Sequence, residues 1–239
     1  MTLVADIPSA SAAPVVPLSG PEARRAFVTS RLPMKGRGIE IAPYFNPMVD
    51  RAKHDVCYVD CIDNDEIQRK AGENPGAKGR YVPRIDAVWV PGKRLAECVG
   101  GRRFDYAVAS HVMEHVPNPL GWLGEILECV NVGGRVAIML PMRTKSMDYY
   151  RQNTTFGQVV GWSIEKPSRP TPTQVMDFLS QSFHHRGEEV VEGAMPPFEE
   201  AERHYSDRDA LTYANFVWDQ KQDRKSTRLN SSHTVISYA

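Results

Sequence analysis

Short apolar runs alternate with turn residues through the middle of the chain. Four runs are bounded by Gly, Pro, Asp or Ser: GIEIA (38–42), DVCYVD (55–60), FDYAVAS (104–110) and RVAIMLP (135–141). A fifth run, RIDAVWV (84–90), is weaker. Runs of this length and flanking are typical of strands buried in a sheet. We therefore predict five strands, the last one introduced by a turn at Gly133-Gly134.

A helical period separates the last two predicted strands. The segment PLGWLGEILECV (119–130) repeats apolar residues at helical spacing, namely Leu120, Leu123, Ile126, Leu127 and Val130. A helix between two strands makes a βαβ unit. A second segment with helical spacing, QVMDFLSQSF (174–183), indicates a helix that packs in the core. We predict an α/β, Rossmann-like, doubly wound fold with a mostly parallel sheet and helices on both faces. In such sheets ligands bind beyond the carboxyl ends of the strands, where the strand order reverses.

Polar residues stand at or near the ends of these strands. The first strand contains Glu40, the second ends at Asp60 and the third contains Asp86. The fourth ends at Ser110-His111. An acidic residue that ends the second strand is well placed to accept hydrogen bonds from ribose hydroxyls. This arrangement favours a ligand that contains a nucleoside.

Composition narrows the range of partners. The chain has 239 residues, 41% hydrophobic and 24% charged, with 29 basic and 29 acidic side chains, which is typical of a soluble globular protein. A balanced charge gives no indication of the excess of Lys and Arg that binding to nucleic acid or an anionic membrane requires. No apolar run approaches the roughly 18 residues of a membrane span. We expect a cytoplasmic protein with neither nucleic acid nor membrane as a partner; the oligomeric state stays open.

The two ends differ from the rest. Residues 1–20 are rich in Ala, Pro and Ser without a sustained period, and we expect a disordered N-terminal arm. Residues 223–239 resemble the translation of a sequencing-library adapter, and we expect a non-native tail there. The expected domain is 21–222, cut short at its C-terminus.

The segment FDYAVASHVMEHVPNPLGWLGEILECVNVGGRVAIMLP resembles the fourth strand, crossover helix and fifth strand of class I S-adenosylmethionine-dependent methyltransferases. GIEIAPYFNPMV resembles a variant of the family's first motif, and MDYYRQNT resembles a D-x-x-R-x-x-T element of one bacterial subgroup. The resemblance implies S-adenosylmethionine as cofactor, with Asp60 and Asp86 at its ribose and adenine, and Ser110 and His111 beside its methionine end. It also implies methyl transfer to a small molecule or, from the subgroup alone, a glycan precursor.

The first motif departs from the family because few glycines follow the strand. Ala42, followed by Pro43, stands where the family has a Gly-rich loop, so the chain must reach the cofactor by a different turn. Ala42 and, within the first strand, Glu40 are candidate cofactor contacts. The cofactor carries no phosphate, so a phosphate-binding loop is not required. A domain of this fold that has lost its cofactor and its activity is the alternative.

Two histidines follow the fourth strand, and charged residues follow the fifth. His111, and after it His115, are candidate general bases, because imidazole titrates near neutrality. Four residues are candidates for the acceptor side: Glu114, Arg143, Asp148 and Arg151. The last three fit a solvated charged loop equally well.

The same histidines also match a zinc-ligand pattern. His111, Glu114 and His115 spell H-x-x-E-H, so a zinc hydrolase is a third function. Zinc ligation by this pattern needs a continuous helix, which Pro117 and Pro119 disfavour. We therefore expect no metal.

Overall fold

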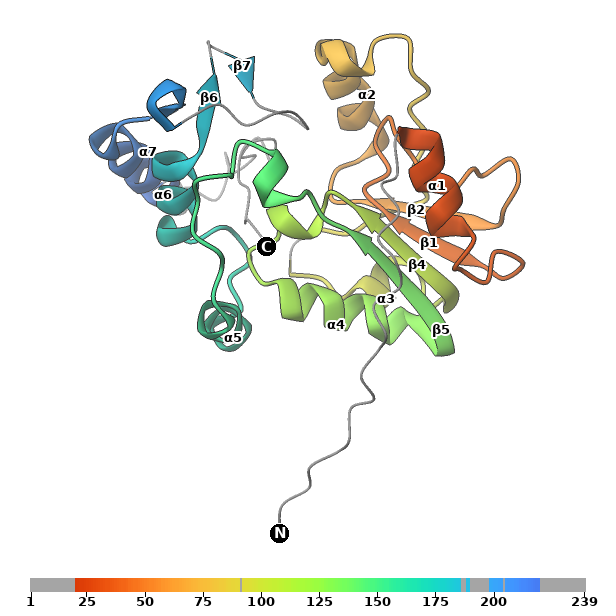
Figure 1. Cartoon of the computed structure of the whole chain (residues 1–239). Helices are drawn as coiled ribbons and strands as arrows, with labels where there is room; N and C mark the ends of the chain where they lie inside the picture. Colours follow the sequence, from red (N-terminus) through yellow and green to blue (C-terminus); the bar gives the residue numbers. More distant parts are fainter. Residues whose placement is uncertain (1–19, 91, 186–187, 190–197, 204, 220–239) are drawn as a thin grey trace, which may run out of the picture.

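A five-stranded sheet forms the centre of the molecule. The computed structural model describes residues 20–90, 92–185, 188–189, 198–203 and 205–219. The strands are β1 (Gly38–Ile41), β2 (Val56–Asp60), β3 (Ala87–Val88), β4 (Phe104–Ser110) and β5 (Val130–Met139), in the order β3-β2-β1-β4-β5 (Figure 1). All four neighbouring pairs are parallel. The order reverses between β1 and β4, which are adjacent although two strands separate them in the chain.

Helices cover both faces of this sheet, and each strand contributes to both because successive side chains point to opposite faces. One face packs against α3 (Leu95–Cys98) and α4 (Pro119–Cys129). Its core includes Ile39, Ile41, Cys57, Val59, Ala107, Leu95 and Ile126. The other face packs against α1 (Pro21–Thr29) and α2 (Asn64–Glu73). Its core includes Val56, Tyr58, Tyr106, Val108, Val28 and Ile67. The predicted Rossmann-like, doubly wound fold is confirmed.

The fifth strand differs from its prediction. It begins at Val130, directly after α4, and the expected turn at Gly133-Gly134 is wrong because both glycines lie within the strand. Gly133 has a φ of 81°, and the pairing of β4 with β5 shifts register between Phe104 and Tyr106. A Cβ at Gly134 would lie 2.8 Å from the carbonyl oxygen of Asp105. The two glycines therefore permit an irregularity in the strand and a close approach to its neighbour.

A smaller part of the chain follows the sheet. It contains α5 (Phe156–Glu165), α6 (Pro172–Gln181) and α7 (Asp207–Asp219). A second sheet has the order β7-β6-β8, with β6 (Phe183–His185), β7 (Glu188–Glu189) and β8 (Glu202–Arg203). The predicted helix at 174–183 is confirmed as α6, which packs on α7 through Val175, Phe178, Leu179, Ala210 and Ala214. In Figure 1 the three helices lie on the side toward which the arrow of β5 points.

Four short 3₁₀ helices complete the described elements: η1 (Pro75–Ala77), η2 (Met113–His115), η3 (Arg143–Lys145) and η4 (Phe198–Glu200). Within the described ranges, no helix has both the length and the apolar character that a membrane span requires. Residues 1–19 of the expected arm and the whole of the expected tail, 223–239, lie outside the described residues.

Candidate active site

Among the described residues, three of the four non-glycine residues with a positive φ follow β1 or β4, at the carboxyl ends of these strands. The two strands pair from Gly38–Tyr106 to Ile41–Ala109, so the chain leaves both of them at the same edge of the sheet. Ala42 has a φ of 51°, Tyr44 of 42° and His111 of 54°. Left-handed backbone costs energy in residues other than glycine, and such positions cluster at functional sites. This edge is also the point of reversed strand order, where ligands bind in sheets of this type.

Glu40 holds the turn that follows β1. Its carboxylate accepts hydrogen bonds from the backbone N–H groups of Met48 (2.7 Å) and Val49 (2.9 Å), one at each oxygen. The side chain is only 1% exposed, and burial raises the pKa of Glu40 to about 7. Glu40 therefore shapes the turn that carries Ala42 and Tyr44, and its carboxylate is committed to that turn rather than presented at the surface.

Asp60 ends β2, next to this turn. Its Oδ1 accepts hydrogen bonds from the N–H groups of Cys61 (2.7 Å) and Ile62 (3.4 Å). Burial raises the pKa of Asp60, and the hydrogen bond from Cys61 opposes that rise. The amide of Ala42 donates to the carbonyl oxygen of Val59 at 2.7 Å, so the turn after β1 lies directly beside the end of β2. Asp60 thus has the position that the sequence predicted, at the same edge as Ala42.

Asp86 has a different position from the one predicted. It precedes β3 rather than lying within it, because β3 pairs with β2 only through Ala87 and Val88. Its carboxylate accepts a hydrogen bond from the N–H of Tyr58 at 2.7 Å and is bound by Arg51. Tyr58 lies two residues before the carboxyl end of β2. Asp86 therefore connects β2 to the start of β3 within the sheet and does not lie at the carboxyl edge.

The segment after β4 brings two histidines to one buried carboxylate. Nδ1 of His111 lies 3.4 Å from Oε1 of Glu114, and Nε2 of His115 lies 3.9 Å from the same oxygen. Glu114 is 2% exposed, whereas 47% of the His111 side chain is exposed. The Oε2 of Glu114 has no hydrogen-bond partner among the described residues. Glu114 can therefore orient His111 while the imidazole stays accessible.

The zinc pattern in this segment lacks the helix that it needs. Residues Met113–His115 form the single turn η2 and not a continuous α-helix. Within the part of the chain that the structure describes, no three His, Cys, Asp or Glu side chains come together in a group that could hold a metal.

The charged residues after β5 form a buried network. Arg151 binds Asp148 and Asp177 of α6, each at 2.7 Å, and both Arg151 and Asp148 are 3% exposed. Burial raises the pKa of Asp148, and the charge of Arg151 opposes that rise. Arg143 donates to the carbonyl oxygens of Tyr149 and Arg151. The alternative of a solvated charged loop is therefore wrong for Asp148 and Arg151.

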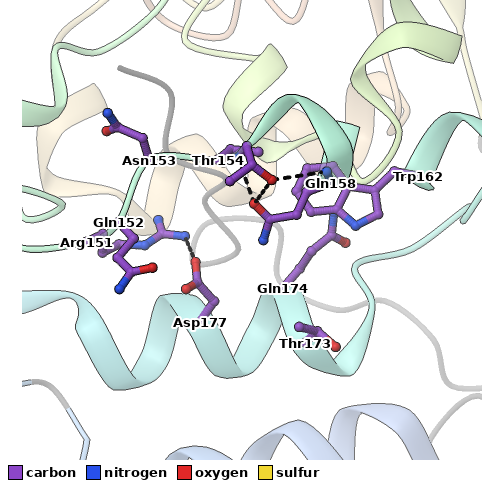
Figure 2. Close-up of a pocket in the computed structure, with 10 residues that line it drawn as sticks. Arg151, Gln152, Asn153, Thr154, Gln158, Trp162, Thr173, Gln174 and Asp177 are labelled. Atoms are coloured by element: carbon purple, nitrogen blue, oxygen red, sulfur yellow. Dashed lines mark hydrogen bonds and ion pairs between the residues drawn. The ribbon is translucent and has the colours of Figure 1, made fainter. Parts of the chain in front are cut away.

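A pocket of about 180 Å³ lies between residues 151–155, α5 and α6. In Figure 2, Arg151 and Asp177 lie at one end of it and Trp162 at the other, with Gln158 and Gln174 between them. Sequence reasoning missed this pocket apart from Arg151. The sequence does contain one indication of the helices that form this pocket. Two T-x-x-Q capping boxes, Thr155 with Gln158 and Thr171 with Gln174, mark the starts of α5 and α6.

Gln174 connects the pocket to the segment that follows β4. Its Oε1 accepts from the N–H of Thr171 at 2.8 Å, and its Nε2 donates to the carbonyl oxygen of Pro117 at 3.0 Å. Pro117 is two residues beyond His115 in the segment that follows β4. The predicted residues therefore separate into two groups. Glu40, Ala42, Asp60, Ser110 and His111 lie at the carboxyl edge of the sheet, and Arg143, Asp148 and Arg151 lie in the network beside the pocket.

A family model and two solved structures resemble parts of this chain. A family model described as a methyltransferase domain matches residues 34–192. No curated protein matched the sequence. Among solved structures, the glycopeptide N-methyltransferase MtfA is similar over 49% of this chain, with 15% identity and a TM-score of 0.33, and the chain spans 52% of its length. A hypothetical protein of Thermus thermophilus is similar over 62% of this chain and 85% of its own length, with 19% identity and a TM-score of 0.34.

Proposed function

The chain belongs to the methyltransferase-domain family, and on this premise we propose that it transfers a methyl group from S-adenosylmethionine to a small molecule or glycan precursor. One observation carries the proposal. The backbone is left-handed at Ala42 and His111, which directly follow two adjacent strands at the point where the strand order reverses. Asp60 lies at the same edge, one strand away.

The residues of this edge fit a nucleoside-containing cofactor. Asp60 supplies a carboxylate at the end of β2, where it can accept hydrogen bonds from ribose hydroxyls. Ala42 and Tyr44 give the chain after β1 a turn that glycines would otherwise provide, and Glu40 holds that turn in place. The shortage of glycines in the first motif therefore does not remove the turn. This supports a binding-competent edge over the alternative of a degenerate domain.

His111 is the proposed general base for a hydroxyl acceptor. When bound, the cofactor supplies an electrophilic methyl group on a sulfonium. His111 takes the proton from the acceptor hydroxyl as the new oxygen–carbon bond forms and the sulfur–carbon bond breaks, which leaves a neutral thioether. Oε1 of Glu114, at 3.4 Å from Nδ1 of His111, orients the ring. His115 is the second candidate.

The first experiment is a thermal melt of the full chain with S-adenosylhomocysteine, because a ligand that binds only the native state raises the transition temperature. At a ligand concentration of 100 times the dissociation constant, the expected stabilisation is roughly 2.7 kcal/mol. Asp60→Ala is the test variant and should reduce the shift. Arg203→Ala, in an exposed ion pair with Asp207, is the matched control and should keep it. A cooperative melt without any shift would favour the degenerate domain.

A further inference from the structure

We propose that the pocket between α5 and α6 is a binding site for the ring of a neutral sugar, presented as the methyl acceptor. This inference deepens the proposed function and rests on it, because it names the class of acceptor. The observations that carry it are the chemistry of the pocket walls, the balance of charge within them, and the connection of the pocket to the segment of His111.

The pocket walls offer paired donors and acceptors. Gln152 and Asn153 present exposed side-chain amides, and Thr173 presents an exposed hydroxyl from the first turn of α6. An amide or hydroxyl both donates and accepts, as each hydroxyl of a sugar does. The volume of about 180 Å³ is roughly ten times the room that one water requires. The space therefore suits a small hydroxylated ring.

Trp162 adds an apolar surface to these polar groups. It lies in α5 at the end of the pocket opposite Arg151 and Asp177, and its side chain is half-buried (Figure 2). An indole offers a large flat face with one polar N–H. A pyranose ring has carbon-bound hydrogens on its faces and hydroxyls around its rim. A ring that lies on Trp162 would therefore direct hydroxyls toward the amides and threonines of the other walls.

The balance of charge disfavours an anionic ligand. The guanidinium of Arg151 is bound by two carboxylates, Asp148 and Asp177, each at 2.7 Å. This group carries an excess of negative charge, so it offers no attraction for a phosphate. The side-chain oxygens of Thr155 and Thr171 already accept from the N–H groups of Gln158 and Gln174 in the first turns of α5 and α6. A neutral ligand therefore fits better than a phosphorylated one.

The pocket also lies on the appropriate side of the sheet. Helices α5 and α6 lie beyond the end of the sheet toward which β5 points, as Figure 1 shows. Gln174 connects the wall of the pocket to Pro117, close to His115 and Glu114. A sugar in the pocket would therefore contact a wall that Gln174 holds against the segment of His111, the candidate base.

The test is ligand-detected NMR on the full chain with methyl glycosides of a neutral hexose, a deoxyhexose and an N-acetylhexosamine. We expect saturable binding of at least one glycoside in the millimolar range. Trp162→Ala should weaken that binding at least tenfold, and Thr173→Val, a milder change at an exposed position, should weaken it severalfold. Phe156→Ala is the matched control, because Phe156 is an aromatic of the same helix that is 81% exposed and does not line the pocket.

Three results would overturn the inference: no saturable binding of any glycoside, tighter binding of glucose 1-phosphate than of the glycosides, or equal binding by the Trp162 and Phe156 variants. The melt with S-adenosylhomocysteine separates this failure from failure of the proposed function. A melt that shifts without sugar binding would remove the sugar site and leave the methyltransferase. Sugar binding without a shift would leave the site and remove the cofactor.

Discussion

The buried carboxyl of Glu40 should make the stability of the protein depend on pH. Burial raises the pKa of Glu40 from 4.5 to about 7 in the folded chain. Because the folded state then holds its proton more tightly than the unfolded state, this contribution to stability is full below pH 4.5. It is lost as the pH rises to about 7. At roughly 1.4 kcal/mol per pH unit, the loss amounts to roughly 3 kcal/mol.

The perturbation that isolates this effect is Glu40→Gln, which keeps the shape of the side chain but cannot titrate. The free energy of unfolding is measured by urea denaturation at several values between pH 5 and 8. Relative to the natural chain, the variant should gain most of the roughly 3 kcal/mol across that interval. Met48→Leu is the control, because it alters the same turn and retains the carboxyl. Parallel pH profiles for the natural chain and Glu40→Gln would refute the reasoning.

Four further predictions concern residues of the site and of the buried network. Ala42→Gly should raise the free energy of unfolding by up to about 1 kcal/mol in urea denaturation, because glycine adopts the φ of 51° without strain. A lower free energy of unfolding for this variant would contradict a strained turn. Arg151→Met should lower the free energy of unfolding by about 3–5 kcal/mol, because the buried carboxylate of Asp148 loses its counter-charge. The exposed Arg203→Met should change it by no more than about 1 kcal/mol. Similar losses in the two variants would count against the buried ion pair. His111→Ala should lower kcat by about 10²–10⁴-fold in a methyl-transfer assay with the sugar found by NMR. Glu114→Gln should lower kcat less than His111→Ala does, because the imidazole loses the carboxylate that orients it, and an unchanged kcat would remove that role.

The strands of the sheet could be predicted because burial on both faces leaves continuous apolar runs. The predicted run at 104–110 coincides with β4, and those at 38–42 and 55–60 exceed β1 and β2 by one residue each. The start of β5 was wrong because glycine usually marks a turn. In this strand Gly133 and Gly134 permit a register shift instead. Whether a Gly-Gly pair forms a turn or a register shift depends on the pairing with the neighbouring strand, which the sequence does not show.

The burial of the charged network and the existence of the pocket could not be predicted in the same way. Asp148 and Arg151 are three residues apart in a loop, but Arg151 is also bound by Asp177 of α6, 26 residues further along the chain. Most residues that line the pocket are polar, and they follow no apolar period. Long-range packing of α5 and α6 decides both features, and a local pattern carries no information about it.

The two hydrogen bonds of Gln174 bear on how the specificity of such an enzyme could diversify. One amide fixes the start of α6 and, through Pro117, its distance from the segment of His111. The exposed residues of the pocket, such as Gln152, Asn153 and Thr173, take no part in that connection. Under the proposed function, recognition of the acceptor and the chemical step would then depend on different residues. Substitutions in the pocket walls would change which acceptor enters and leave the reactive geometry unchanged.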